Sequence, residues 1–265
     1  MRPTFTRPTL NRSAITRLVR PVAAAALLGL ASPALADLDL AAMTGPEREA
    51  FRAEVRAYLL EHPEVLMEAI EALDGQQAAA QAQADAGLVA AQGPAIFEDG
   101  HSWVGGNPEG DVTVVEFMDY RCGYCRRAFQ EVEELVGRDG NIRFVLKEFP
   151  ILGEQSDLAS RFAVAVQQVH GPDAYKDAHD ALMAMETDVT PDSLARLADG
   201  LGLEAAPLLS RMEGPEVAAV IDANHALGQT LGISGTPTFV LGGRMVRGYL
   251  PLDAMRAAVA EERAG

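Results

Sequence analysis

The residues from Val112 to Arg127 have the sequence VTVVEFMDYRCGYCRR. The apolar, β-branched run that begins at Val112 predicts a buried strand, because such side chains fit a pleated sheet. The segment after the two cysteines has apolar residues at helical spacing, with glutamates between them. Cys122 is therefore predicted to lie where a strand gives way to a helix, in or next to the first helical turn.

The two cysteines, Cys122 and Cys125, are the only ones in the 265-residue sequence. A thiolate is the nucleophile in disulfide exchange, and the partial positive charge of a helix N-terminus favours it. Two intervening residues let the second thiol attack the mixed disulfide formed by the first, which releases the substrate. We therefore predict that Cys122 is the attacking thiol and Cys125 the resolving thiol.

Two other interpretations of the pair are half of a zinc site and a structural disulfide. A zinc site usually has four ligands, but the sequence has no second cysteine pair, and its five histidines show no metal-ligand spacing. One pair is also too few for a fold held together by disulfides. The spacing and the strand–helix context favour redox catalysis, with no metal and no bound cofactor.

The first 36 residues have the features of a cleavable secretory signal. Five arginines and no acidic residue accompany a short apolar run from Val22 to Ala31, and Ala34-Leu35-Ala36 is a small-x-small cleavage site. The run is too short to span a bilayer, which needs about 20 residues. Cleavage removes the five arginines and lowers the net charge from −16 to −21. We therefore expect a periplasmic protein that does not bind nucleic acid through bulk electrostatics.

Residues 37–92 are predicted to form a helical region ahead of the catalytic domain. Apolar residues lie on one face of a helix predicted from Pro46 to Leu60, and Pro63 opens a second helix with its own apolar face. The Ala- and Gln-rich tract from 75 to 92 is either a continuation of that helix or a flexible linker. The apolar faces pack against each other or against copies from other chains. We predict self-association, because a short isolated helical hairpin is marginally stable.

Residues 93–265 alternate between predicted strands and helices. Besides the central strand, the predicted strands cover Ile96 to Val104 (with a turn), Asn141 to Phe149, Thr238 to Leu241 and Arg244 to Arg247. The predicted helices cover the segment that follows the cysteines, several stretches between about 156 and 211, Val217 to Leu231, and Leu252 to Glu262. This order predicts an α/β domain with a mixed sheet and a helical insertion.

The order of elements, with C-x-x-C after the central strand and Thr236-Pro237 before the hairpin, resembles the thioredoxin fold. The segments EFMDYRCGYC, which begins at Glu116, and SGTPTF, which begins at Ser234, are similar to the two active-site segments of the DsbA family. The insertion at 156–211 resembles that family's helical insertion. The resemblance implies that Thr236-Pro237 lies against the cysteines with Pro237 cis, where neighbouring backbone groups pair with a substrate peptide. The alternative is an ordinary proline that opens an edge strand.

The sequence VRAYLLEHPEVLMEAIEAL, from Val55 to Leu73, resembles the N-terminal oligomerisation region of ScsC-type proteins. These are periplasmic DsbA-fold proteins linked to copper tolerance. The resemblance implies a homo-oligomer, such as a trimer, that assembles through residues 37–92.

Glu116 lies six residues before Cys122 on an otherwise apolar strand, where a buried carboxyl is costly. It corresponds to the acid that DsbA-family members keep beneath the disulfide. The resemblance implies that this acid accepts or passes the proton of the resolving thiol. The alternative is a side chain that reaches solvent at the sheet edge. Lys147 is a candidate charge partner, although the neighbouring Glu148 makes that pairing ambiguous.

The dipeptide between the cysteines is Gly123-Tyr124, whereas oxidising DsbA proteins carry a histidine there that helps hold the thiolate. A less stabilised thiolate makes the pair a weaker oxidant. Gly-Tyr resembles instead the dipeptide of DsbC-type isomerases, which also oligomerise through an N-terminal region. We therefore predict an exported isomerase or reductase of protein and peptide disulfides, kept reduced by a membrane reductase of DsbD or ScsB type. The alternatives are a monomeric dithiol oxidase and a non-enzymatic chaperone or copper-handling protein.

Overall fold

The computed structural model describes residues 40–264, so the predicted signal segment, residues 1–36, lies outside the described residues. The chain divides into two units, Met1–Pro63 and Glu64–Gly265. No helix within residues 40–264 is long and apolar enough to cross a membrane.

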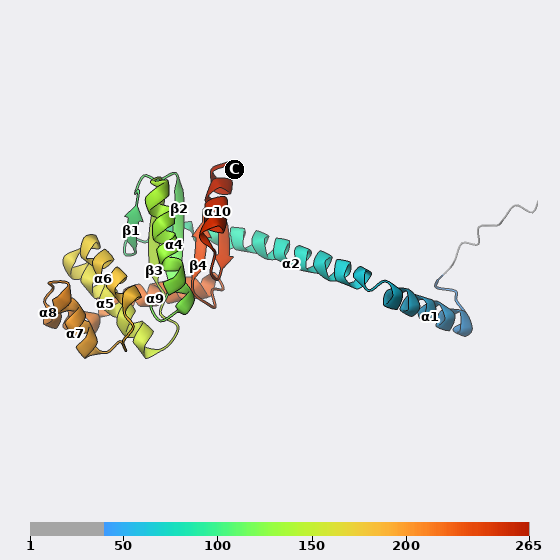
Figure 1. Cartoon of the computed structure of the whole chain (residues 1–265), viewed down its shortest axis with the longest axis horizontal. Helices are drawn as coiled ribbons and strands as arrows, with labels where there is room; N and C mark the ends of the chain where they lie inside the picture. The colour runs from blue at the N-terminus through green and yellow to red at the C-terminus, as the bar shows by residue number, and fades with distance from the viewer. Residues whose placement is uncertain (1–39, 265) are drawn as a thin grey trace, which may run out of the picture. The chain divides into compact units, whose positions relative to one another are not determined.

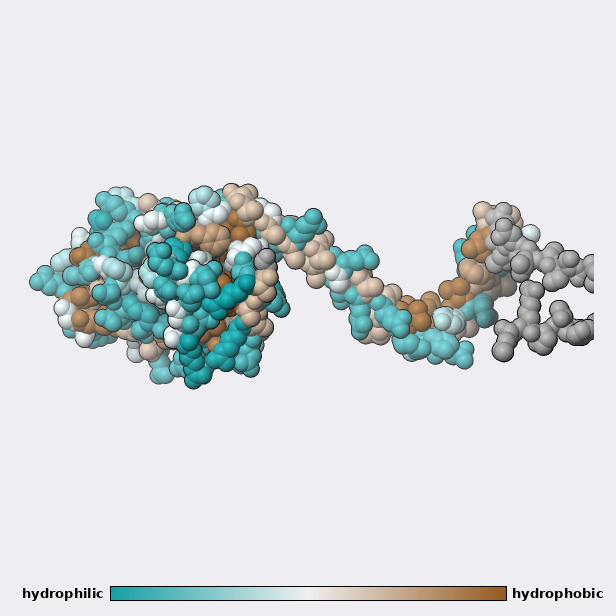
Figure 2. Space-filling model, turned by 90° about the horizontal axis from the view of Figure 1, so that it is seen from above, coloured by the Kyte–Doolittle hydropathy of each residue, from teal (hydrophilic) through white to brown (hydrophobic). Residues whose placement is uncertain are grey.

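The described part of the first unit contains one helix, α1 (Gly45–Glu61), close to the predicted bounds. Glu47 accepts a hydrogen bond from the backbone N–H of Thr44 at 2.8 Å, as in a capping box. The helix ends before Pro63, because a residue that precedes proline avoids the α conformation. Its large apolar residues are exposed, and Figure 2 shows hydrophobic surface along it. They are Phe51, Val55, Tyr58 and Leu60.

The second unit is built on a five-stranded sheet (Figure 1). Its strands are β1 (Trp103–Gly106), β2 (Val112–Met118), β3 (Ile142–Glu148), β4 (Thr238–Leu241) and β5 (Arg244–Arg247). The spatial order is β1-β3-β2-β4-β5; β2 and β3 are parallel, and the other neighbours are antiparallel. The parallel pair needs a crossover, which α4 (Gly123–Asp139) provides. The mixed sheet is as the sequence predicts.

Two hydrophobic cores lie on the two faces of this sheet, because successive strand residues point to opposite sides. Val114 of β2 belongs to the larger core, together with apolar residues of α4 and of α10 (Leu252–Ala264). Val115 belongs to the smaller core, which α9 (Pro215–Thr230) covers. Helices therefore cover both faces, as expected for strands that are buried on both sides.

The helical insertion between β3 and α9 packs into the larger core. Its helices are α5 (Glu154–His170), α6 (Pro172–Ala184), α7 (Pro191–Gly200) and α8 (Ala205–Met212). Proline lies in the first turn of both α6 and α7, where the missing N–H costs no intrahelical bond. The insertion occupies nearly the residues predicted for it.

The sequence prediction is wrong for the start of this domain. Ile96 lies in a short helix, α3 (Gly93–Phe97), rather than in a strand, and β1 begins only at Trp103. Pro94 in the first turn starts the helix, which buries Ile96 completely in the smaller core. The carboxylate of Asp99 then accepts hydrogen bonds from two backbone N–H groups and ends the turn.

The Ala- and Gln-rich tract continues a long helix, α2 (Glu64–Ala91), rather than forming an irregular linker. The last turns of α2 pack on the sheet: Val89 is buried in the smaller core, and Asp85 forms an ion pair with Arg247 of β5. One guanidinium nitrogen of Arg247 is 3.0 Å from Asp85 Oδ1 and 3.1 Å from the carbonyl oxygen of Leu231. Earlier apolar residues of α2 are exposed. They are Leu66, Met67, Ile70 and Leu73.

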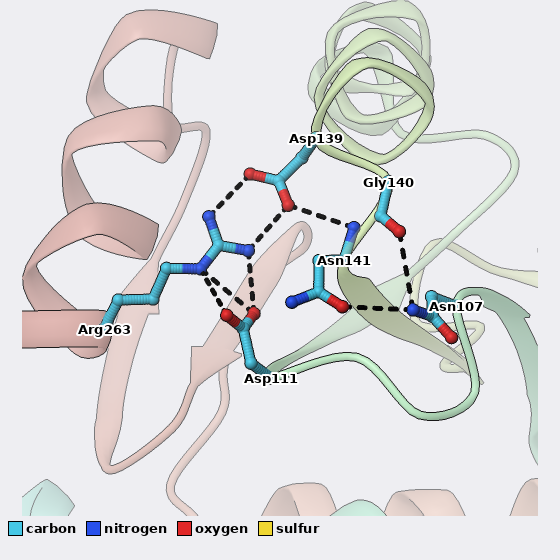
Figure 3. Close-up of polar contacts among 6 residues, drawn as sticks. All are labelled: Asn107, Asp111, Asp139, Gly140, Asn141 and Arg263. Atoms are coloured by element: carbon cyan, nitrogen blue, oxygen red, sulfur yellow. Dashed lines mark hydrogen bonds and ion pairs between the residues drawn. The ribbon is translucent and has the colours of Figure 1, made fainter.

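A second charged contact holds the C-terminal helix (Figure 3). Arg263 of α10 bonds both oxygens of Asp111, which precedes β2, and both oxygens of Asp139 at the end of α4. Such bidentate pairing fixes geometry as well as charge. It joins α10, α4 and the loop before β2 at the end of the sheet where β2 begins.

We expect Asp85→Ala to loosen the end of α2, because Arg247 loses a charged hydrogen-bond partner worth about 2 kcal/mol. Amide hydrogen exchange of residues 81–91 should quicken. Asp74→Ala is a matched control, since it makes the same change in propensity on an exposed turn of the same helix. Equal exchange in the two variants would contradict the anchoring role of Asp85.

Candidate active site

The turn between β2 and α4 places Cys122 at the N-cap of α4. The backbone N–H of Cys122 donates to the carbonyl oxygen of Asp119 at 3.1 Å. The buried carboxylate of Asp119 accepts from the N–H groups of Arg121, Ile151 and Leu152. These hydrogen bonds connect the turn to the segment after β3. The position of Cys122 is therefore fixed both by the turn itself and by that segment.

The sulfur of Cys122 faces the segment before β4. In the thiol form its Sγ donates to the carbonyl oxygen of Thr236 at 3.1 Å, and 7% of the residue is exposed. Hydrogen bonds from the Cys125 thiol, from Thr236 and from the backbone N–H groups of Cys125 and Tyr124 lower the pKa of Cys122 to about 5, although burial opposes them. Cys122 is therefore a thiolate at neutral pH, which is the nucleophilic form.

Cys125 lies one turn inside α4 and is fully buried. Burial, the hydrogen bond to Cys122 and the charge of Glu116 raise its pKa far above the ordinary value. The two thiols therefore differ: one is ionised beside solvent, and the other is a neutral thiol beneath it. This difference is what attack by one sulfur and later resolution by the other require.

Glu116 is buried on β2, and its Oε1 has no hydrogen-bond partner among the described residues. It points to the same face of the sheet as Val114, towards α4. Burial, followed by the charges of Cys122 and Glu133, raises its pKa to about 8. The carboxyl is thus mostly protonated at neutral pH and lies within electrostatic reach of both cysteines.

The Thr236–Pro237 peptide bond is cis. The carbonyl oxygen of Pro237 accepts from the N–H of Gly248 at 2.9 Å, which ties this segment to the residues after β5. Thr238 in β4 pairs with Phe117 in β2. The residues just before β4 therefore lie near the end of β2, which leads into the cysteine-bearing turn. The structure thus places Cys122, Cys125, Glu116, Thr236 and Pro237 close to one another.

Lys147 is not the charge partner of Glu116, contrary to the sequence hypothesis. Its Nζ contacts the carboxylate of Asp99 and donates to the carbonyl oxygen of Ala95 at 2.8 Å. The reason is strand register: Lys147 pairs with Phe117, and both point to the face opposite Glu116. Within residues 40–264, Glu116 is therefore left without a counter-ion.

A buried hydroxyl–carboxylate network beside the cysteines was missed by sequence reasoning. Glu148, at the end of β3, accepts from the hydroxyls of Tyr120 (2.8 Å), Tyr175 (2.6 Å) and Ser160 (2.7 Å). Burial raises the pKa of Glu148 to about 7 against these hydrogen bonds. The network joins the residue two before Cys122 to helices α5 and α6 of the insertion. The sequence signal was an acid at the end of an apolar strand.

The fold and the dithiol define a thioredoxin-fold thiol–disulfide oxidoreductase. The family model of the DSBA-like thioredoxin domain matches residues 113–260, and the chain belongs to this family. A second model, the copper resistance protein ScsC N-terminal domain, matches residues 47–80.

Solved structures show the same similarity. A thioredoxin-like oxidoreductase from Silicibacter pomeroyi is 45% identical, with a TM-score of 0.61 over 65% of this chain and 98% of that one. A linker-deletion variant of ScsC from Proteus mirabilis is 26% identical, with a TM-score of 0.63, and covers 84% of this chain and 98% of its own. A periplasmic thioredoxin-like protein from Salmonella enterica serovar Typhimurium is 28% identical, with a TM-score of 0.60 over 65% and 96% of the two chains.

Curated relatives include much longer proteins. The Na(+)/H(+) antiporter NhaA 3 from Salinispora tropica is 31% identical over 59% of this chain, which spans about a quarter (24%) of the antiporter's length. The similarity is thus to one part of that protein.

We predict that the reactivity of Cys122 depends on pH with a midpoint near 5. Its alkylation by iodoacetamide, followed by mass spectrometry, should be nearly constant above about pH 6.5 and fall through pH 5, because the lowered pKa keeps the thiolate. Cys125→Ala should raise this midpoint, since the Cys125 thiol is the largest cause of the lowering. A midpoint above about 8, as in a free thiol, would contradict the geometry.

Glu116→Gln should stabilise the protein more at high pH than at low pH. The folded pKa of Glu116, about 8, is above its ordinary value of 4.5. Its contribution is therefore fully present below about pH 4.5 and is lost as pH rises towards 8. Urea unfolding should show the variant gaining about 4 kcal/mol on the wild type between these pH values. The exposed Glu109→Gln is the control; an equal gain in both variants would exclude Glu116 as the cause.

Proposed function

We propose that the protein is an exported disulfide isomerase or reductase that acts on protein and peptide disulfides and works as a homo-oligomer. The observation that carries this proposal is the unequal dithiol. Cys122 is a partly accessible thiolate with a pKa of about 5, whereas Cys125 is a buried thiol with a raised pKa. A thiolate that is held ready beside a protonated partner can attack a client disulfide without first being activated.

The proposed reaction begins when the Cys122 thiolate attacks one sulfur of a client disulfide. A Cys122–client disulfide forms, and the second client sulfur leaves as a thiolate. Isomerisation follows if another client thiolate attacks this mixed disulfide and releases Cys122. Formation of the mixed disulfide removes the Cys122 charge, which is one cause of the raised pKa of Glu116. Reduction follows if the ionised form of Glu116, favoured at this stage, accepts the proton of Cys125 and the Cys125 thiolate displaces the client as a thiolate. The Cys122–Cys125 disulfide is then reduced by a membrane reductase of DsbD or ScsB type.

The N-terminal region supports an isomerase that holds several active sites together. Residues 47–80 match the N-terminal domain of ScsC, and the apolar residues of α1 and those of α2 are each exposed in the single chain. Exposed apolar faces of this kind are buried when copies of a chain associate. We propose that residues 37 to about 92 assemble the oligomer, a trimer being one arrangement, with residues 93–265 as the catalytic domain.

Export to the periplasm is supported by the signal-like features of residues 1–36 and by the similarity to a periplasmic thioredoxin-like protein from Salmonella. A dithiol in that compartment is exposed to oxidants, so an isomerase or reductase needs a source of electrons. The membrane reductase is part of the proposal for this reason.

One observation favours a second function, dithiol oxidase. A stabilised thiolate makes the reduced form stable and the disulfide form a better oxidant. The pKa of Cys122, about 5, lies between the values of about 7 for thioredoxin and about 3.5 for DsbA. The oxidase would be monomeric and would transfer its Cys122–Cys125 disulfide to client thiols.

The deciding experiment is reactivation of scrambled ribonuclease by the reduced mature protein and by a version that begins at Gln81. This start keeps Asp85 and Val89, which pack on the sheet, and removes the segment that matches the ScsC domain. We expect the long form to reactivate the ribonuclease and the short form to fail, while both reduce insulin at similar rates.

A third protein, mature Cys122→Ser, is the control for reactivation that is independent of disulfide chemistry. If neither active form reactivates ribonuclease but both oxidise a reduced dithiol peptide, the protein is an oxidase. If the cysteine variant reactivates as well as the wild type, the disulfide-exchange function is wrong.

A further inference from the structure

Three arginines flank the dithiol of a strongly acidic protein. Arg121, Arg126 and Arg127, which we call the arginine cluster, lie within five positions of Cys122, although the whole chain has a net charge of −16. In the described part of the chain, none of the three forms an ion pair, whereas Arg138, farther along α4, pairs with Glu134. Nothing in the site's own chemistry assigns them a role, because the groups that lower the pKa of Cys122 are hydrogen-bond donors.

Arg121 and Arg126 are neighbours within the arginine cluster. The backbone N–H of Arg126 donates to the carbonyl oxygen of Cys122 at 3.1 Å, and its Nε donates to that of Tyr120 at 2.7 Å. Burial, followed by the charge of Arg121, lowers the pKa of Arg126, so the two guanidinium groups are near each other. The Nη2 of Arg126 is buried and has no hydrogen-bond partner among the described residues.

Arg127 has different neighbours and is exposed. Its guanidinium is 4.6 Å from the centre of the Tyr249 ring, a cation–π distance. The ring of Tyr124, between the two cysteines in sequence, is 6.2 Å from the same tyrosine. Tyr249 is itself held by a 2.6 Å hydrogen bond from its hydroxyl to Glu131. Arg127 is therefore held beside the dipeptide that separates the two cysteines.

Local charge decides recognition at this site, because salt screens charges beyond about 8 Å at physiological ionic strength. Glu186 acts on Arg126 and offsets part of the cluster, and Glu131 is engaged by Tyr249. The carboxylate of Asp119, in the same turn, is engaged by three backbone N–H groups, so the three guanidinium groups are charged side chains near Cys122 that have no ion-pair partner among the described residues.

We propose that the arginine cluster makes the site select polypeptides that carry aspartate or glutamate beside the cysteine to be attacked. The inference rests on the proposed function and names its substrate class. An acidic side chain on either side of the client sulfur would pair with Arg121 and Arg126 or with Arg127. Such pairing raises the rate of encounter and orients the sulfur.

The test measures how fast the reduced mature protein attacks single-cysteine peptides capped as mixed disulfides with thionitrobenzoate. Cys122 attacks the peptide sulfur, and thionitrobenzoate leaves as a coloured thiolate; Cys125 then displaces the peptide thiol and leaves the protein disulfide. The peptides differ only in the residues next to cysteine: Asp, Asn or Lys. We expect the Asp peptide to react about fivefold faster than the Lys peptide, the sum of modest exposed pairs.

The ratio of Asp to Lys rates is the informative quantity, because a change in the thiolate alone would alter both rates equally. The double variant Arg121→Gln, Arg127→Gln should lower the ratio to about one, whereas Arg127→Lys should largely keep it. Arg138→Gln removes the same charge from the far end of α4 and should leave the ratio unchanged. In the wild type, about 1 M salt should also abolish the ratio, because screening then acts within about 3 Å.

Equal rates for the three peptides, or a preference for Lys, would overturn the acidic selectivity and leave the proposed function intact. A ratio that survives both the double variant and high salt would also overturn it. Failure to react with any peptide, while Cys122 still reacts with iodoacetamide, would overturn the proposed function itself.

Discussion

The active site depends on one contact between segments 114 residues apart, the 3.1 Å approach of Cys122 Sγ to the carbonyl oxygen of Thr236, which is a hydrogen bond while Cys122 is a thiol. Neither segment sets it alone. The strand–helix turn fixes the sulfur, and the antiparallel pairing of β4 with β2 fixes the carbonyl. The contact leaves Cys122 slightly exposed and covers Cys125 completely. Two chemically identical side chains therefore acquire different protonation states from position alone.

The ionisable groups buried around this contact avoid an uncompensated charge in two ways. Glu148 accepts three hydroxyl hydrogen bonds, and Lys147 has a carboxylate and a carbonyl as partners. Both pairings lower the cost of desolvation. Among the described residues, the buried Oε1 of Glu116 has no hydrogen-bond partner. Burial therefore raises the pKa of Glu116, and the carboxyl is mostly protonated at neutral pH. The uncompensated group is the one beneath the cysteines, where a carboxyl that can gain or lose a proton near neutral pH is chemically useful.

The sequence predicts best what depends on neighbours along the chain. The apolar, β-branched run of β2 and the helical spacing after Cys125 are local, so their elements and the position of Cys122 follow from residues 112–136 alone. The paired C-x-x-C and Thr-Pro segments add the long-range contact only through resemblance to a family. Glu116 could be chosen because an acid on an apolar strand is unusual.

What the sequence could not show depends on register and on distant partners. Lys147 and Glu116 are adjacent in strands but on opposite faces, and only the pairing of Lys147 with Phe117 reveals it. The hydroxyls of Tyr120 and Tyr175 reach Glu148 from 28 and 27 residues away, beyond any periodic pattern. The helix α3 has five residues, too few to show a helical periodicity in the sequence. In the structure it is stabilised by complete burial of Ile96.

The last turns of α2 connect the N-terminal region to this chemistry. Asp85 anchors them to Arg247 of β5, and the backbone right after β5 bonds Pro237 through Gly248. The β4–β5 hairpin therefore connects the Asp85–Arg247 ion pair to the segment that contains Thr236. An assembly that buries the exposed apolar residues of α2 would act on a helix whose end is fixed to the sheet. The sequence between residues 75 and 91 is Ala-rich and a good helix former. As a continuous helix, this segment can transmit a restriction of α2 motion from the oligomerisation region to the active site, whereas a flexible linker would not.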